Sequence, residues 1–222
     1  MADSRLYVHV LLDRSGSMED CRDKTIGAFN EYVNSLKVQS RAGTRLSLTT
    51  FDSESTDLVF DALRIDEVAK LTRDTFVPRG MTPLFDAVAN VVARIDKVTL
   101  VPDERVALAI LTDGLENASQ EMKAEAVAKL LIDRQERCNW LVQYLGANQN
   151  AWAAGEQIGV KRAHSLDFAV GSVAPAMQSM VASVGRYRAA APVDSRNAAS
   201  FTPAERAAAK GDGPDKPDKP SR

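Results

Sequence analysis

Strand-length apolar runs alternate with helical periods along most of this 222-residue chain. The apolar runs occupy residues 6–12, 46–51, 58–63, 106–112, 140–145 and 163–168. Between the first two runs, Ile26, Phe29, Val33 and Leu36 recur at the spacing of one helix face. This alternation is typical of an α/β protein whose mostly parallel sheet has helices on both faces. We therefore predict a doubly wound, six-stranded, Rossmann-like sheet.

Two segments indicate how the strands are ordered. Residues 106–111 are apolar without alternation, as expected for a central parallel strand that is covered on both faces. Residues 51–57 are too few and too polar for a crossover helix, so the second and third strands should form an antiparallel hairpin at the sheet edge. Three further helix faces are predicted: Leu84, Val88, Val91 and Ile95; Met122, Val127, Leu130 and Leu131; and Val173, Met177, Met180, Val184 and Tyr187.

The end of the chain differs in composition. From about residue 190 the apolar period is lost, and the last ten or so residues are mainly Gly, Pro, Asp and Lys, which cannot bury enough surface to fold. We expect residues 1–189 to form one domain and residues 190–222 a mostly disordered tail. Within that tail, Thr202, Pro203 and Glu205 match a capping box, and Gly211 can end a short helix near residues 203–210.

Composition excludes several classes of partner. The formal net charge is −2 and basic residues are scattered, so neither nucleic acid nor an anionic membrane surface is an expected partner. No segment approaches transmembrane length, and the first apolar run does not resemble a signal peptide. Cys21 and Cys138 are two isolated thiols, which favours a reducing environment. We expect a cytoplasmic protein.

Oxygen-bearing side chains follow two of the predicted strands. Asp13, Ser15 and Ser17 come directly after the first strand, and Asp113 follows the fourth. Thr82 stands just before the helix that precedes the fourth strand. In an open α/β sheet, loops at the carboxyl ends of strands part at the point where the strand order reverses, and ligands bind there. The five oxygen side chains are therefore predicted to form a site for a hard divalent cation.

This set of five residues resembles the metal-ion-dependent adhesion site of the von Willebrand factor A domain family. The resemblance covers about residues 5–189, and the segments 76–80, 113–117 and 145–149 are similar to small, stand-alone bacterial and phage members. It implies that Ser15 and Ser17 bind the ion directly and Thr82 binds it directly or through water. Asp13 and Asp113 would act mainly through bound waters. Mg²⁺ is the implied ion, with Mn²⁺ or Ca²⁺ as other possibilities.

The resemblance also implies a function. A divalent ion held by neutral oxygens strongly attracts an anion, so a Glu or Asp carboxylate of a protein partner would complete its coordination. The expected function is a metal-dependent protein–protein interaction module that is not an enzyme. By the same resemblance, the last helix, over residues 172–187, is expected to shift when Thr82 changes between direct and water-mediated coordination.

Two alternatives remain open. An aspartate after the first strand also resembles the haloacid-dehalogenase type of phosphotransferase or hydrolase, but Ser15 stands where that chemistry needs an acid-base aspartate. A purely structural domain, whose metal only ties loops together, is the other alternative. His9 and His164 are interpreted as structural residues, and three nearby aspartates are interpreted as solvated or capping: Asp20, Asp52 and Asp86.

Overall fold

The computed structural model describes residues 4–39, 43–147 and 150–211, and within them a six-stranded sheet has the order β3-β2-β1-β4-β5-β6. The strands are β1 (Leu6–Asp13), β2 (Thr44–Phe51), β3 (Thr56–Arg64), β4 (Arg105–Thr112), β5 (Leu141–Ala147) and β6 (Ser165–Phe168). Neighbouring strands are parallel except β2 and β3, which are antiparallel. The predicted sheet, including its antiparallel edge strand, is confirmed.

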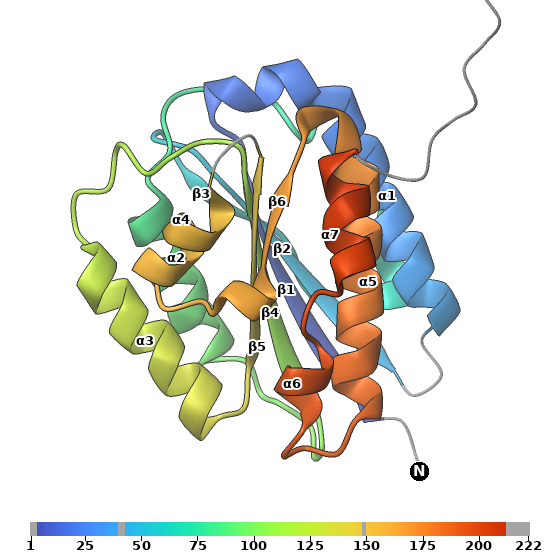
Figure 1. Cartoon of the computed structure of the whole chain (residues 1–222). Coiled ribbons are helices and arrows are strands. Elements are labelled where there is room, and N and C mark those ends of the chain that lie inside the picture. The colour runs from blue at the N-terminus through green and yellow to red at the C-terminus, as the bar shows by residue number, and fades with distance from the viewer. Residues whose placement is uncertain (1–3, 40–42, 148–149, 212–222) are drawn as a thin grey trace, which may run out of the picture.

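Helices cover both faces of this sheet (Figure 1). One face carries α1 (Arg22–Gln39), α5 (Val173–Ala189) and α7 (Pro203–Lys210); the other carries α2 (Leu84–Ile95), α3 (Ala124–Arg137) and α4 (Ala151–Gln157). A one-turn α6 (Ser195–Ala198) and four 3₁₀ turns complete the described elements: η1 (Gly16–Cys21), η2 (Ile65–Glu67), η3 (Arg162–His164) and η4 (Val170–Ser172). None of the helices in the described ranges is long and apolar enough to cross a membrane.

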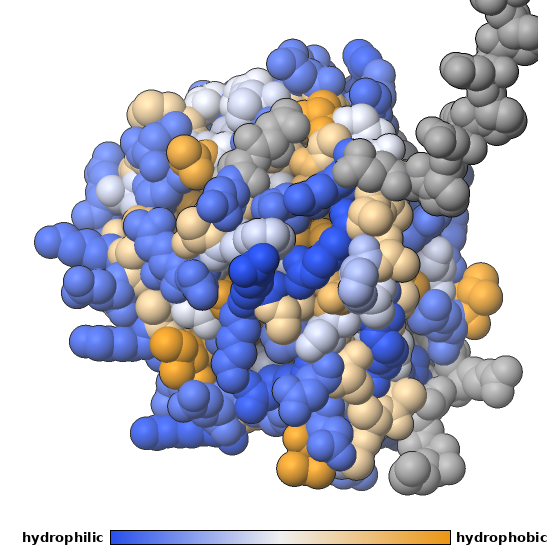
Figure 2. All heavy atoms as spheres, viewed as in Figure 1, coloured by the Kyte–Doolittle hydropathy of each residue, from blue (hydrophilic) through white to orange (hydrophobic). Residues whose placement is uncertain are grey.

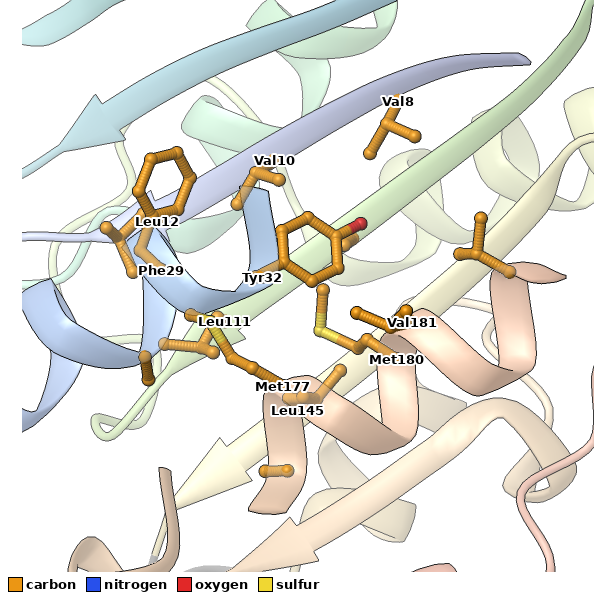
Figure 3. Close-up of a cluster of buried hydrophobic side chains, with 14 of the residues drawn as sticks. Val8, Val10, Leu12, Phe29, Tyr32, Leu111, Leu145, Met177, Met180 and Val181 are labelled. Carbon is orange, nitrogen blue, oxygen red and sulfur yellow. The ribbon is translucent and has the colours of Figure 1, made fainter. Parts of the chain in front are cut away.

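The period of two along β1 divides its side chains between two cores. Val8, Val10 and Leu12 belong to the cluster beneath α1 and α5, whereas Tyr7 and Leu11 belong to the cluster beneath α2 and α3. Figure 3 shows the first cluster, in which Phe29 and Tyr32 of α1 and Met177, Met180 and Val181 of α5 face the strands. Burying each such side chain contributes about 1.5–3 kcal/mol. This layer holds α1 and α5 firmly against the strands.

Some predicted boundaries differ from the structure. Residues 162–164, expected mostly within the sixth strand, form η3, and β6 begins at Ser165. Met122, expected on a helix face, precedes α3, and its N–H donates to the Asp86 carboxylate. The sequence periods did not indicate α4, which begins after Asn150, whose side chain accepts a hydrogen bond from the Ala153 N–H. At seven residues, α4 is too short to show a clear period.

The described part of the expected tail packs against the sheet. The predicted short helix is present as α7, with its capping box at Thr202 and Gly211 in the left-handed conformation at φ +84°. Phe201 and Ala209 are buried in the core beneath α5, and Arg186 of α5 forms an ion pair with Glu205 at 2.8 Å. Packing therefore continues to Gly211, past the expected boundary at residue 189. Residues 212–222, expected to be disordered, lie outside the described residues.

Candidate metal centre

The adjacent parallel strands β1 and β4 bring together the loop that carries Ser15 and Ser17 and the loop that follows Asp113. β1 and β4 pair with Leu12 opposite Leu111, so Asp13 at the end of β1 lies beside the end of β4. β2 lies on the other side of β1. The strand order therefore reverses at β1, as the sequence predicted, and the loops that follow β1 and β4 leave the sheet at the same edge.

Asp13 is a buried carboxylate whose hydrogen-bond donors are neutral. Its Oδ1 accepts from the Ser15 N–H at 2.7 Å, and its Oδ2 accepts from the Thr112 hydroxyl. Burial raises the pKa of Asp13 to about 6, and hydrogen bonds from Thr112 and Ser15 only partly offset this rise. The side chain is fully buried, and none of the groups that lower its pKa is a cation.

A chain of hydroxyl contacts joins the two carboxylates of the site. Ser17 Oγ donates to Asp113 Oδ1 at 2.7 Å, so Ser15 Oγ, 3.1 Å away, must be the donor to Ser17. Asp113 is only partly buried, and burial raises its pKa in spite of the Ser17 hydrogen bond. Four of the five predicted residues are thus connected.

The Thr82 hydroxyl lies close to the same group of residues because Gly114, which is beside it, has no side chain. A Cβ at Gly114 would lie 2.9 Å from Thr82 Oγ1 and 3.7 Å from Ser17 Oγ. Thr82 is held there by Asn117, whose Oδ1 accepts from the Thr82 N–H at 2.8 Å and whose N–H donates to the Thr82 carbonyl at 3.2 Å. The structure therefore brings together all five predicted residues. Their binding of an ion stays a prediction.

Arg14 positions the loop that follows β1, a role that no sequence pattern indicated. Its side chain is buried, donating from Nε to Asp52 Oδ2 at 2.7 Å and pairing with Asp57 at 2.8 Å. Its backbone N–H and carbonyl bond to Phe51 and Arg79 at 2.8 and 2.9 Å. Arg14 therefore ties the loop to the β2–β3 hairpin and to the Thr82 loop.

Asp52, which was expected to be solvated or capping, caps the turn that follows β2 but is buried instead of solvated. Asp52 is only 2% exposed and accepts hydrogen bonds from the amides of Glu54 and Ser55 as well as from Arg14 and Arg79. Although burial raises its pKa, these donors outweigh burial and hold the pKa below its usual value. An aspartate at a strand end can be solvated or paired, and only the position of Arg14 decides which.

Glu116 and Asn117, which belong to the segment 113–117 that resembles family members, hold the loop that follows β4. Glu116 accepts from the amide N–H of Phe85 at 2.9 Å and of Ser119 at 2.7 Å, so the loop is bound to the first turn of α2.

The expected capping role of Asp86 is confirmed, because it accepts from the amides of residues 120–122. Asp20 is exposed.

The donor set suits a hard cation that keeps part of its water. It offers three hydroxyls and two carboxylates, all oxygen, which Mg²⁺, Mn²⁺ and Ca²⁺ prefer. In the described ranges, no group of three or more His, Cys, Asp or Glu side chains is arranged to hold a metal ion. The candidate centre is instead rich in hydroxyls, with only two acidic side chains, and its all-oxygen donor set fits a hard divalent ion.

Both histidines have structural hydrogen-bond partners. His9 is buried, with Nε2 2.8 Å from Thr49 Oγ1 and Nδ1 3.2 Å from the Tyr7 hydroxyl. Burial, with a smaller effect of Arg94, lowers the pKa of His9 to about 3, so the ring is neutral at pH 7. His164 lies in η3, where Nε2 is 2.8 Å from the Arg196 carbonyl. Neither histidine hydrogen-bonds to any of the five candidate residues, as far as the chain is described.

Comparison with solved structures identifies the fold. The von Willebrand factor domain of the pilus tip protein Mfa5 from Porphyromonas gingivalis superposes with a TM-score of 0.62 at 11% identity, covering 86% of this chain and 98% of that one. Manganese-loaded TRAP from Plasmodium vivax gives 0.55 at 16% identity, covering 78% and 72%. The chain therefore has the fold of a von Willebrand factor A domain.

A third similar structure is described with zinc in a metal-ion-dependent adhesion site. Proximal thread matrix protein 1 from the mussel byssus, described with a zinc-occupied metal-ion-dependent adhesion site, gives a TM-score of 0.59 at 18% identity. The match covers 81% of this chain and 48% of that protein, so this chain spans about half the length of that relative. Neither a protein-family model nor a curated protein matches the sequence.

Proposed function

We propose that this chain is a metal-dependent protein interaction module, in which a bound Mg²⁺ ion takes a Glu or Asp carboxylate of the partner as a ligand. The observation that carries this proposal is the convergence of Asp13, Ser15, Ser17, Thr82 and Asp113 at one edge of the sheet. The fold shared with proteins whose sites are described as zinc-occupied or manganese-loaded supports it.

The chemistry of the site explains why a carboxylate would bind. Ser15 and Ser17 would hold the ion directly, with Thr82 direct or through water, and these oxygens are neutral. Asp13 and Asp113 would accept hydrogen bonds from the ion's waters. The ion would then keep most of its charge toward solvent, where it attracts an anion. Ser17 is exposed, which leaves that side open to a partner.

Binding explains the site better than the two alternatives. For phosphotransfer, the second position after Asp13 should carry an acid-base carboxylate, but Ser15 is there, and its hydroxyl donates to Ser17. For a purely structural ion, a closed site is expected, whereas Ser17 is exposed and Asp113 is half-buried. The proposed function is therefore binding, without chemistry on the partner.

Isothermal titration of Mg²⁺ and Mn²⁺ into EDTA-stripped protein tests the metal site. We expect Ser17→Ala and Asp13→Asn to weaken binding at least about tenfold, as loss of a group that orients the ion commonly does. The matched control is Asp74→Ala, an exposed aspartate outside the site that should bind the ion as the parent protein does. Circular dichroism verifies that each variant is folded. Parent protein that takes up no ion would contradict the proposal.

Partner capture tests the use of the ion. Immobilised parent protein should retain a partner from lysate in Mg²⁺ and lose it in EDTA, and Asp13→Asn should fail to retain it in either buffer. Asp74→Ala should behave as the parent. Capture that survives both EDTA and Asp13→Asn would show that the site is not the binding face.

A further inference from the structure

Two large apolar side chains are exposed at the edge of the candidate centre. Met81 directly precedes Thr82 and is 53% exposed; Leu115 directly follows Gly114 and is 65% exposed. Scattered apolar residues on a surface are ordinary, but neighbouring ones beside a binding site indicate a contact surface. Figure 2 shows a few hydrophobic residues among hydrophilic ones on the upper part of the molecule, where the loops at the carboxyl ends of the strands lie.

The backbone on either side of these residues is fixed. The Met81 N–H donates to Ser53 Oγ at 2.9 Å, and Gly80 has a φ of +66°, which favours glycine. A Cβ on Gly80 would lie 2.4 Å from Ser53 Oγ. The reciprocal hydrogen bonds between Thr82 and Asn117 tie the two loops to each other. Met81 and Leu115 are thus held in place by their loops while their side chains remain in solvent.

The η1 turn gives the site a second, acidic border. Glu19 and Asp20 are both exposed, and Arg22 pairs only loosely with Glu19, at 3.4 Å. A partner with several acidic residues around its metal-binding carboxylate would meet repulsion here. The charge pattern therefore favours a lone carboxylate.

We propose that Met81 and Leu115 form an apolar rim that packs against a large apolar residue adjacent to the partner's metal-binding carboxylate. This inference rests on the proposed function. An extended peptide advances about 3.3 Å per residue, so a carboxylate at the ion places its neighbours over residues that adjoin Thr82 and Gly114. The partner's recognition sequence is then a single Glu or Asp flanked by a residue such as Leu, Met or Phe. The flexible thioether of Met81 can adapt to each of these.

Two synthetic peptides test the rim on the full, Mg²⁺-loaded chain. The peptides are acetyl-Gly-Leu-Glu-Leu-Gly-amide and acetyl-Gly-Ser-Glu-Ser-Gly-amide, whose symmetric flanks make peptide direction irrelevant. We expect the Leu-flanked peptide to bind about tenfold more tightly in NMR titrations, the effect of burying a few methylene groups. The double variant Met81→Ser/Leu115→Ser should lose this preference and keep its affinity for Mg²⁺.

The matched control is Val38→Ser/Val193→Ser, which removes two apolar side chains that are 85% and 87% exposed elsewhere on the chain. This control should keep the preference for the Leu-flanked peptide. The apolar rim would be contradicted if the parent protein bound both peptides equally, or if the preference survived in Met81→Ser/Leu115→Ser. Either result would leave the proposed carboxylate binding intact. If Mg²⁺-loaded parent protein binds neither peptide, the proposed carboxylate binding fails and the rim fails with it.

Discussion

Asp13 ends β1, and Asp52 directly follows the neighbouring parallel strand β2, yet the surroundings of the two carboxylates differ. Both are buried, at 0% and 2% exposure. Asp52 has the guanidinium groups of Arg14 and Arg79 beside it, whereas the donors that lower the pKa of Asp13 are the neutral Thr112 and Ser15. Consequently the pKa of Asp52 lies below its usual value, and that of Asp13 rises to about 6.

The difference is one of charge compensation at two buried carboxylates. A buried carboxylate is costly unless a positive charge or enough donors compensate for lost water. At Asp52 the protein supplies that charge itself. At Asp13 the donors that the structure shows are the Ser15 backbone N–H and the Thr112 hydroxyl, both neutral. We infer that an ion from solution supplies the charge at Asp13, and the following changes test the contrast.

The largest expected effect comes from Asp52→Ala. This change leaves the Arg14 guanidinium, whose side chain is only 9% exposed, without its buried partner. Removing one member of a buried ion pair commonly costs about 3–5 kcal/mol of the free energy of unfolding, which urea denaturation in EDTA measures. Asp13→Asn is the control, because it removes a charge that forms no ion pair with any residue in the described ranges. An Asp52→Ala variant as stable as the parent would show that the ion pair is not structural.

A smaller effect should appear in the pH dependence of stability without metal. Burial raises the pKa of Asp13 from 3.8 to about 6, so the folded state binds the proton more tightly between these values. Stability relative to Asp13→Asn should therefore fall as pH rises from 4 to 7, by at most roughly 3 kcal/mol. The lowered pKa of Asp52 works in the opposite direction, since its contribution is present above the ordinary value and lost as pH falls through the folded value.

Asp13→Asn is essential as the reference protein when the pH dependence of stability is measured. His9, whose pKa is lowered to about 3, makes the protein less stable as pH falls below 6.5, and His164 acts in the same sense. Both contributions are shared by the parent and Asp13→Asn and cancel in the difference. Denaturation in EDTA at several pH values measures this difference in the free energy of unfolding. A difference that does not vary with pH would mean that Asp13 has a normal pKa and that the contrast with Asp52 is absent.

The smallest expected effect is that of Arg79→Ala. The Arg79 side chain is 41% exposed, and Arg14 remains as the buried cation of Asp52. Exposed ion pairs contribute little, so the free energy of unfolding should drop only slightly, with unchanged affinity for Mg²⁺. Arg73→Ala, which breaks the exposed pair with Asp23, gives the matched value for a pair far from Asp52. If Arg79→Ala lost several times as much free energy of unfolding as Arg73→Ala, Arg79 would be a stabilising partner of Asp52 comparable to Arg14.

The strand order and the five candidate residues could be predicted because both depend on local patterns. Apolar runs and helical periods indicate which segments pair and pack, and parallel strands necessarily present their carboxyl ends at one edge. Asp13 and Asp113 could therefore be expected near each other before any contact was known, and the register of β1 with β4 agrees. Thr82 could be expected there too, because it stands just before the helix that leads into the fourth strand.

The features that could not be predicted depend on single long-range contacts. Arg14 is buried only because Asp52, 38 positions later, accepts its hydrogen bond. Phe201 and Ala209 lie in a segment without an apolar period, and each is buried because the edge of the sheet and α5 are there to receive it. Composition described that segment correctly as weakly apolar but could not show that it packs.

By itself the sequence determined the class of sheet, its hairpin edge and the group of oxygen side chains at the reversal of strand order, because periodicity and strand direction act locally. Only the tertiary structure decided which buried aspartate has a cation and which does not. That distinction depends on where one arginine side chain points, and burial magnifies it because a charge in a low-dielectric interior requires compensation. The same folding leaves Met81 and Leu115 in solvent beside the uncompensated aspartate's site.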